Sequence, residues 1–174
     1  SSIGRAFPTE SERMKIYAVD PGPQACGVVL YDTDRRCVLE SHKAKPVADV
    51  LKAITVHGTA STAHVIACER VQSYGISGAH LLHTAEVYGR VQERANLARL
   101  DFVGMTRRDV LLWLDLLGAP GNRDANVRAR MLELHGGERR AACGTKAAPG
   151  PLYGVASHAW QALGLAVAVA SSPR

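Results

Sequence analysis

The chain has 174 residues, enough for one sizeable hydrophobic core but too few for two comfortable domains. Its formal net charge of +5 permits a nucleic-acid partner without establishing one. The longest apolar run, residues 163–170, is shorter than the roughly 20 residues that span a bilayer. Residues 1–13 are polar and lack the apolar stretch of a signal peptide, so we expect no membrane partner.

The cysteines have no spacing typical of a metal site or a redox motif. Three of the four lie in apolar, strand-like segments, where a small buried thiol is the favoured interpretation. This pattern predicts a reducing, cytoplasmic setting.

The first part of the chain predicts a leader followed by three strands. Residues 1–13 are expected to be a disordered leader or an expression remnant, and residues 14–174 a single domain. Short apolar runs at residues 15–20, 25–31 and 37–42 are separated by turn-forming residues. We expect three consecutive antiparallel strands that form a meander.

The rest of the chain alternates between helical and extended patterns. Thr106 is suited to cap one of the helices, whose apolar stripe would be Val110, Leu111, Leu114 and Leu117. Residues 136–153, rich in Gly, Pro and Ala, are expected to be mobile. Expected helices are residues 46–57, 79–98, 107–117, 124–134 and 155–170, and expected strands are residues 64–69 and 100–105. This order predicts an α/β fold with a mixed sheet and helices on both faces.

Two acidic residues end apolar strands. Asp20 closes residues 15–20 and Glu69 closes residues 64–69. A charge there is costly unless it lies at the end of the sheet, near solvent and a compensating cation. If the two strands are neighbours, both acids converge, and either one takes a proton or a divalent cation holds both. The alternative is that each acid only ends its strand in a polar turn.

The final expected helix adds two polar residues on one face. His158 and Gln161 are three residues apart, which places them one above the other on a helix. Small residues nearby would let this helix approach the sheet and bring His158 toward the strand ends; they are Gly154, Ala156, Ala159, Ala162 and Gly164. Both polar residues could also be ordinary core or surface side chains, and that interpretation stays open.

Five segments, in order, resemble those of the RuvC-type Holliday-junction resolvases, which have an RNase H-like fold. The segments are IYAVDPGPQACGVVLYD, ACERVQSYG, HTAEVYGRVQERA, TRRDVLLWLDLLGAPGNRDANVRARM and SHAWQALGLAVA. None is specific alone, but their order extends the resemblance from residue 15 to residue 170. A phage-encoded member of the family is one interpretation.

The resemblance implies a crossover junction endodeoxyribonuclease that resolves four-way DNA by hydrolysis with two Mg²⁺ or Mn²⁺ ions per active site. It makes Asp20, Glu69 and His158 catalytic metal ligands. Gln161 falls where the family has another aspartate, which is a departure because an amide offers a metal an oxygen without a charge. The second metal position, or the activity itself, is therefore weaker than in the family.

The resemblance also implies a DNA surface and a dimer. Phosphate contacts are expected from Arg107, Arg108, Arg123 and Arg128. Tyr74, in a Gly- and Ser-containing loop after Glu69, is expected to stack on an unpaired base at the junction. A symmetric junction implies a C2 homodimer, and the helix at residues 79–98 has more apolar surface than one core face requires.

Three other functions remain open at this stage. A different RNase H-like nuclease would cut flaps or RNA–DNA hybrids. A non-catalytic DNA-binding module on the same fold would explain Gln161. An actin-like or sugar-kinase-type ATPase lobe also begins with a strand, Asp-x-Gly and a second strand, but it needs a second lobe that one domain of this length lacks.

Overall fold

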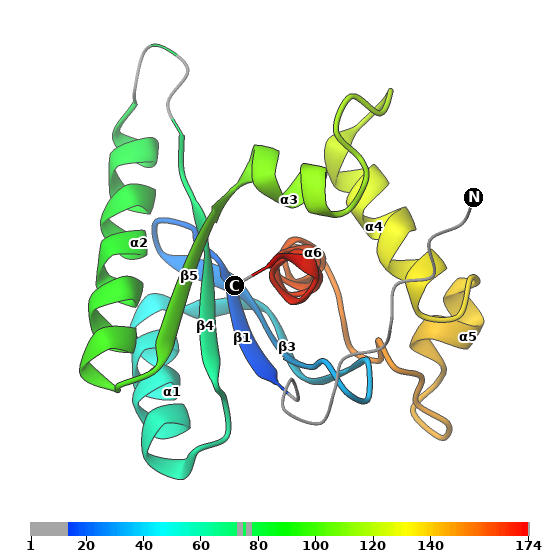
Figure 1. Cartoon of the computed structure of the whole chain (residues 1–174), viewed down its shortest axis with the longest axis horizontal. Coiled ribbons are helices and arrows are strands. Elements are labelled where there is room, and N and C mark those ends of the chain that lie inside the picture. The colour runs from blue at the N-terminus through cyan, green and yellow to red at the C-terminus, as the bar shows by residue number, and fades with distance from the viewer. Residues whose placement is uncertain (1–13, 73–74, 76–77, 174) are drawn as a thin grey trace.

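The computed structural model describes residues 14–72, 75 and 78–173 (Figure 1), so the expectation for residues 1–13 lies outside it. One mixed sheet of five strands forms the centre, in the order β3-β2-β1-β4-β5. Their bounds are β1 Lys15–Asp20, β2 Ala25–Asp32, β3 Cys37–Pro46, β4 Val65–Arg70 and β5 Asp101–Thr106.

The pairing of the strands follows the predicted order. β1, β2 and β3 form an antiparallel meander, whereas β4 is parallel to β1 and β5 is parallel to β4. Parallel strands need a crossover connection, which α1 and α2 provide. β1 and β4 are therefore neighbours near the middle of the sheet, and both run toward the same end.

Helices cover both faces of the sheet (Figure 1). α1 and α2 lie on one face, and α6 lies on the other, packed against α3 and α4. Their bounds are α1 Val47–Ala60, α2 Ala79–Leu97, α3 Arg107–Trp113, α4 Arg123–Leu134, α5 Arg139–Cys143 and α6 Ala159–Ser171. No helix within these described ranges is long and apolar enough to cross a membrane.

Two hydrophobic cores result from the alternation of side chains along the strands. In β1, Ile16 and Ala18 belong to the core beneath α6, whereas Tyr17 and Val19 belong to the core beneath α1 and α2. A strand buried on both faces must be apolar almost throughout, which explains why β1 has no polar residue between its two ends.

Three local predictions were wrong. α3 ends at Trp113 because Asp115 has a φ of 60°, outside the helical region, and Leu117 is exposed rather than part of the apolar stripe. α6 begins at Ala159 rather than near residue 155, since Ser157 and Gly154 have positive φ values of 49° and 84°.

The segment at residues 136–153 is more ordered than its composition predicted. It contains α5, and Ala142 of that helix is fully buried. The Leu152 amide donates to the Ala142 carbonyl at 2.8 Å, and the Gly150 amide donates to Cys143 at 3.0 Å. Backbone hydrogen bonds therefore fix a segment that sequence composition alone marks as a loop.

Candidate active site

Asp20, the last residue of β1, and Glu69, the next-to-last residue of β4, lie together at one end of the sheet. Val19 of β1 is the register partner of Cys68 of β4, so Asp20 and Glu69 are the next residues on two adjacent parallel strands. Both line a pocket of about 270 Å³, together with Arg107 and His80. The structure thus brings together the acids that the sequence placed on separate strands.

Burial makes the ionised form of both acids costly. It raises the pKa of Asp20 to about 6 and the pKa of Glu69 to about 7. The Arg107 guanidinium lowers both pKa values, whereas Asp124 raises both, and Asp20 further raises that of Glu69. Two half-buried carboxylates with so little compensating charge favour binding of a cation.

Arg107 reaches this pair because of how α3 begins. Thr106 ends β5 and caps α3: its hydroxyl accepts from the Asp109 amide at 3.1 Å, and the Asp109 carboxylate accepts from the Thr106 amide at 3.0 Å. Arg107 is therefore the first residue of the helix, beside the end of β4. Its Nη1 donates to Glu69 Oε2 at 3.3 Å.

His158 lies against Asp20 at the start of α6. Its Nδ1 is 3.5 Å from Asp20 Oδ2. The sequence prediction placed His158 inside the final helix, but it is the residue that precedes α6, and its side chain is largely exposed. A histidine in this position is accessible to a ligand while remaining next to the carboxylates.

Gln161 follows one helical turn later and is buried, with only 8% of its surface exposed. Its Oε1 has no hydrogen-bond partner among the described residues. Gly164, a further turn along, would place a Cβ 2.6 Å from Val127 of α4. Gln161 therefore lies on the side of α6 between the Asp20 contact and α4.

The side chains of Asp20, Glu69, His158 and Gln161 carry atoms of the kind that bind divalent cations, although they are not arranged as a complete metal site. Among residues 14–72, 75 and 78–173, no three His, Cys, Asp or Glu side chains converge closely enough to bind a metal ion. Carboxylate oxygens are the ligands that Mg²⁺ and Mn²⁺ prefer, and the orphaned Oε1 of Gln161 is a neutral oxygen of the same hard type.

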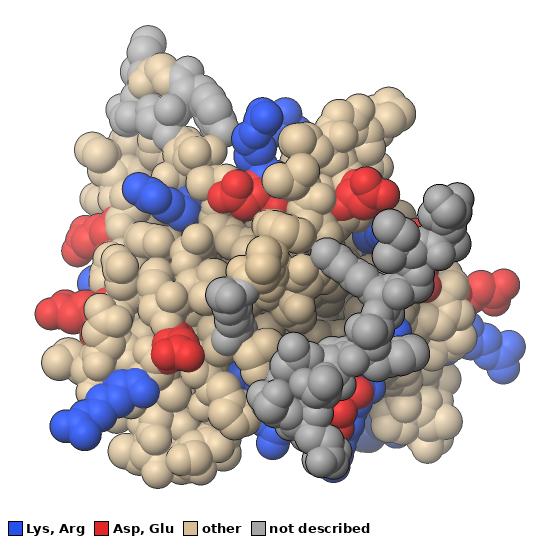
Figure 2. All heavy atoms as spheres, in the orientation of Figure 1, with Lys and Arg blue, Asp and Glu red and all other residues tan. Residues whose placement is uncertain are grey.

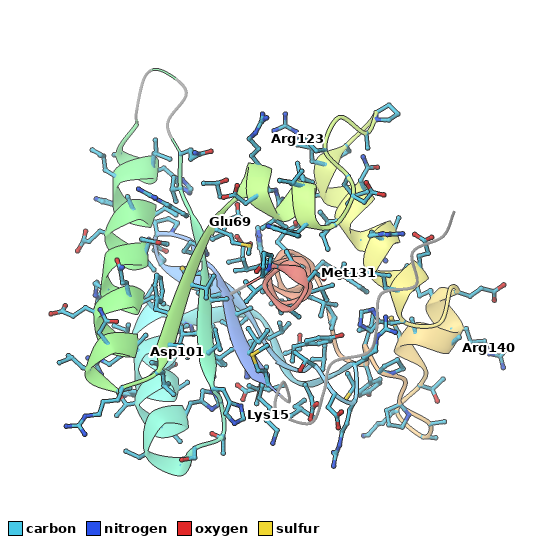
Figure 3. The ribbon with its side chains drawn as sticks, in the orientation of Figure 1. Lys15, Glu69, Asp101, Arg123, Met131 and Arg140 are labelled. Atoms are coloured by element: carbon cyan, nitrogen blue, oxygen red, sulfur yellow. The ribbon has the colours of Figure 1, made fainter. Side chains whose placement is uncertain are left out.

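The predicted phosphate-binding arginines fall into two groups. Arg107 is bonded to carboxylates, and the Arg128 guanidinium lies over the Trp160 ring, 5.3 Å from its centroid. Arg108 and Arg123 are exposed. Figure 2 shows acidic and basic side chains close together along the upper edge of the molecule in this view. Figure 3 labels Arg123 on the same edge, above Glu69. Tyr74 lies outside the described residues.

The exposed surface of α2 contains apolar residues among polar and charged ones. Val87 and Val91 are buried in the core, whereas Leu82 is 62% exposed, and Ala85 and Gly89 are exposed on the same helix. Leu82 and Ala85 therefore give this helix apolar surface beyond its core face, as the sequence predicts, whereas Val87 and Val91 form part of the core face itself.

A larger hollow, about 430 Å³, lies between β3 and residues 149–154. The acid in its wall, Glu40, already accepts from Lys45 at 2.9 Å and contacts His42 at 2.8 Å. Because its charge is paired, this hollow lacks the unbalanced carboxylates found at the ends of β1 and β4.

Sequence reasoning missed Asp124. This residue stands in the first turn of α4, where Asn122 Oδ1 accepts from its amide at 2.9 Å, and its carboxylate accepts from Arg107 Nη2. An acid in the first turn of a helix is common because it complements the helix dipole. No sequence signal therefore separates Asp124 from an ordinary helix-starting residue.

No known protein family matches the chain by sequence, and no curated protein does. Among solved structures, it is similar to Thermus thermophilus RuvC in complex with a Holliday junction substrate, with a TM-score of 0.60 and 16% identity over 89% of this chain and 91% of that one. A second structure of RuvC from Thermus thermophilus gives a TM-score of 0.59 and 19% identity, over 89% and 92% of the two chains.

The yeast mitochondrial Holliday junction resolvase Ydc2 is also similar, with a TM-score of 0.53 and 10% identity, over 97% of this chain and 79% of that one. The chain therefore has the fold of these proteins, an α/β fold with a mixed sheet between two layers of helices. This confirms the RNase H-like fold class that the sequence predicts.

Proposed function

Because the chain shares the fold of the RuvC-type resolvases, we propose that it is a metal-dependent endonuclease that resolves four-way DNA junctions. One observation carries the proposal: Asp20, the last residue of β1, and Glu69, the next-to-last residue of β4, lie side by side on parallel strands, mostly buried and short of compensating charge, with His158 beside Asp20. This arrangement suits hydrolysis of a phosphodiester bond, whose transition state carries negative charge that a bound cation can stabilise.

Asp20, Glu69 and His158 would hold Mg²⁺ or Mn²⁺, with two ions per active site. The bound ions would activate water and stabilise the leaving oxygen. Asp20 is next to Glu69 across the β1–β4 pair and lies 3.5 Å from His158, so these three side chains could hold the same group. Gln161 would add its buried Oε1, a neutral oxygen, from the side of α6 between the Asp20 contact and α4.

DNA would approach along the edge that bears Arg108 and Arg123. Both are exposed and lie on α3 and α4, whose first turns flank the carboxylates. Contacts to phosphates position a nucleic acid without reading its sequence, which suits an enzyme that recognises the shape of a junction. Stacking of Tyr74 on an unpaired base stays a prediction.

A homodimer through the outer face of α2 would place two active sites on one symmetric junction. The exposed Leu82, Ala85 and Gly89 provide an apolar surface on which a second copy can pack closely.

All four cysteines are free thiols, which supports a reducing compartment such as the cytoplasm.

The deciding experiment is cleavage of a labelled four-way junction with Mg²⁺ or Mn²⁺. Duplex, flap and RNA–DNA hybrid substrates of the same sequence serve as controls. We expect cuts on the junction that disappear in Asp20→Asn and Glu69→Gln, while binding of the junction persists. Equal cutting of flaps or hybrids would contradict junction selectivity, and a parental rate in either variant would contradict the assignment of the site.

Two observations favour a second candidate, a DNA-binding module without catalysis. Gln161 replaces an expected acid, and Arg107 pairs with Glu69. Junction binding without cleavage across Mg²⁺ and Mn²⁺ concentrations would establish this alternative.

A further inference from the structure

A third carboxylate is joined to the active site through a shared arginine. Arg107 Nη1 donates to Glu69 Oε2 at 3.3 Å, and Nη2 of the same guanidinium donates to Asp124 Oδ1. One side chain therefore links the end of β4 to the first turn of α4. The Asp124 side chain is 66% exposed, so its carboxylate has room to change rotamer.

Asp124 shares the Arg107 guanidinium with Glu69, which places its carboxylate close to this acid. Its charge also raises the pKa of Asp20 and of Glu69. Asp124 therefore belongs to the same group of interacting charges, although it comes from a helix on the far side of Arg107.

A count of formal charges shows why this matters for a divalent cation. Asp20 and Glu69 carry two negative charges when ionised, and Arg107 offsets one of them. Without a further acid, one net negative charge would face the four positive charges of two divalent cations. Asp124 brings the net charge of the group to −2.

Gln161 supplies an independent sign that a ligand belongs here. It is buried, and its Oε1 has no partner among the described residues. A buried acceptor without a donor costs about 1–3 kcal/mol unless something else satisfies it. Gln161 lies one turn after His158, which contacts Asp20. It also lies one turn before Gly164, which packs against Val127 of α4. Val127 in turn lies one turn after Asp124.

We propose that Asp124 is a further acidic residue of this site and supplies to the divalent cations the negative charge that Gln161 lacks. The inference rests on the proposed function. Glu69 needs its oxygens for the metal in the loaded enzyme, and Asp124 keeps the Arg107 guanidinium paired when Glu69 releases it.

Binding of Mn²⁺ to the full-length, DNA-free protein tests the inference without relying on activity. Calorimetric titrations would compare the parent with Asp124→Asn, Gln161→Asp and the double variant. Asp101→Asn is the matched control: Asp101 is an exposed aspartate at the other end of the β4–β5 pair from Glu69 (Figure 3). Asp124→Asn should fold normally, because Asn122 still caps α4.

We expect Asp124→Asn to weaken Mn²⁺ binding by about tenfold or more, the size typical of losing a residue that supports a metal site. Gln161→Asp should tighten binding, and the double variant should return to within about twofold of the parent, since either carboxylate supplies the missing charge. Asp101→Asn should match the parent.

Each contrary result has a separate meaning. If the parent binds no Mn²⁺, both the proposed function and this inference are wrong. If the parent binds but Asp124→Asn binds equally well, only the role of Asp124 is wrong. If the double variant stays as weak as Asp124→Asn, Asp124 does not compensate for Gln161.

Discussion

Gly27 of β2 lies in backbone contact with His158. A Cβ at position 27 would lie 2.5 Å from both the carbonyl carbon and oxygen of His158. Gly27 is also the register partner of Asp20, so the missing side chain lets the start of α6 come down beside the carboxylate. The contact between His158 and Asp20 therefore depends on a glycine in a neighbouring strand.

We expect Gly27→Ala to displace His158 and to reduce junction cleavage by tenfold or more, with a loss of stability of about 1–3 kcal/mol from overpacking. Gly58→Ala is the matched control, because its Cβ would meet the Ala98 carbonyl oxygen at 2.8 Å between α1 and α2, away from the site. It should lose similar stability but little cleavage per folded molecule. Urea unfolding and cleavage rates measure the two effects, and full cleavage by Gly27→Ala would contradict this role.

The contribution of Asp20 and Glu69 to the stability of the metal-free protein should fall as pH rises. Asp20 has a pKa of about 6 in the folded protein against an ordinary value of 3.8, and Glu69 is raised to about 7. The folded state therefore binds more protons than the unfolded state between about pH 4 and pH 7. The contribution of these two groups to the free energy of unfolding is complete below about pH 4, and it is lost as the pH rises to about 7.

Asp20→Asn removes the cost of ionising a buried acid and should raise the free energy of unfolding at pH 8 by on the order of 2 kcal/mol while abolishing cleavage. Asp101→Asn, at an exposed position, should leave the free energy of unfolding unchanged. Urea titrations with a chelator present measure both. An Asp20→Asn protein no more stable than the parent at pH 8 would show that Asp20 ionises without cost.

Tyr31 and His135 form a buried hydrogen bond between β2 and the end of α4. Tyr31 Oη donates to His135 Nε2 at 2.9 Å, and His135 Nδ1 donates to the Met131 carbonyl at 2.7 Å, which requires a neutral imidazole. Burial lowers the pKa of His135 below its usual value. The unfolded state therefore binds the proton more readily than the folded state. As a result, the contribution of this pair to the free energy of unfolding is lost as the pH falls below about 6.5.

Tyr31→Phe should cost about 1–2 kcal/mol at pH 7.5, because His135 Nε2 is left without a donor. Cleavage by the folded protein should persist, since this pair is remote from the carboxylates. Thermal unfolding with parallel cleavage assays checks both expectations. Unchanged stability would mean that water replaces the phenol.

Arg108 and Arg123 should dominate the salt dependence of junction binding. Each phosphate contact on duplex DNA contributes about −0.9 to the slope of log K against log salt. The double variant Arg108→Ala, Arg123→Ala should flatten the slope by about two contacts per protomer. Arg139→Ala with Arg140→Ala, on α5 away from Glu69 (Figure 3), should not change it. If only the α5 variant flattened the slope, the DNA-binding surface would lie on α5 instead.

Leu82→Glu should convert the proposed dimer to a monomer, since it places a charge in an apolar contact on α2. Val56→Glu on α1 is the control, because Val56 is similarly exposed at 58% against 62% for Leu82. Sedimentation of both variants and the parent decides the matter. A dimer that survives Leu82→Glu would place the interface elsewhere.

The sequence by itself determined most of the fold, because strands and helices are specified by local patterns. The apolar runs that became β1, β2 and β4 stand within a residue of their predicted bounds, and Thr106 caps α3 as its position predicted. It also singled out Asp20 and Glu69 as candidate site residues, since a charge at or next to the end of a buried strand is conspicuous without knowledge of its neighbours. Positive φ values at Ser157 and Asp115 were not predictable, because neither residue type requires them.

Only the tertiary structure decided how the charges pair. Arg107 and Arg128 look alike as basic residues near the site, yet one bonds carboxylates and the other lies over Trp160. Asp124 joined the site only because α4 begins next to the first residue of α3. An ion pair depends on the distance between segments that are remote in the chain. Hydrophobic periodicity fixes which face of a segment is buried, but it does not fix which charged side chains meet.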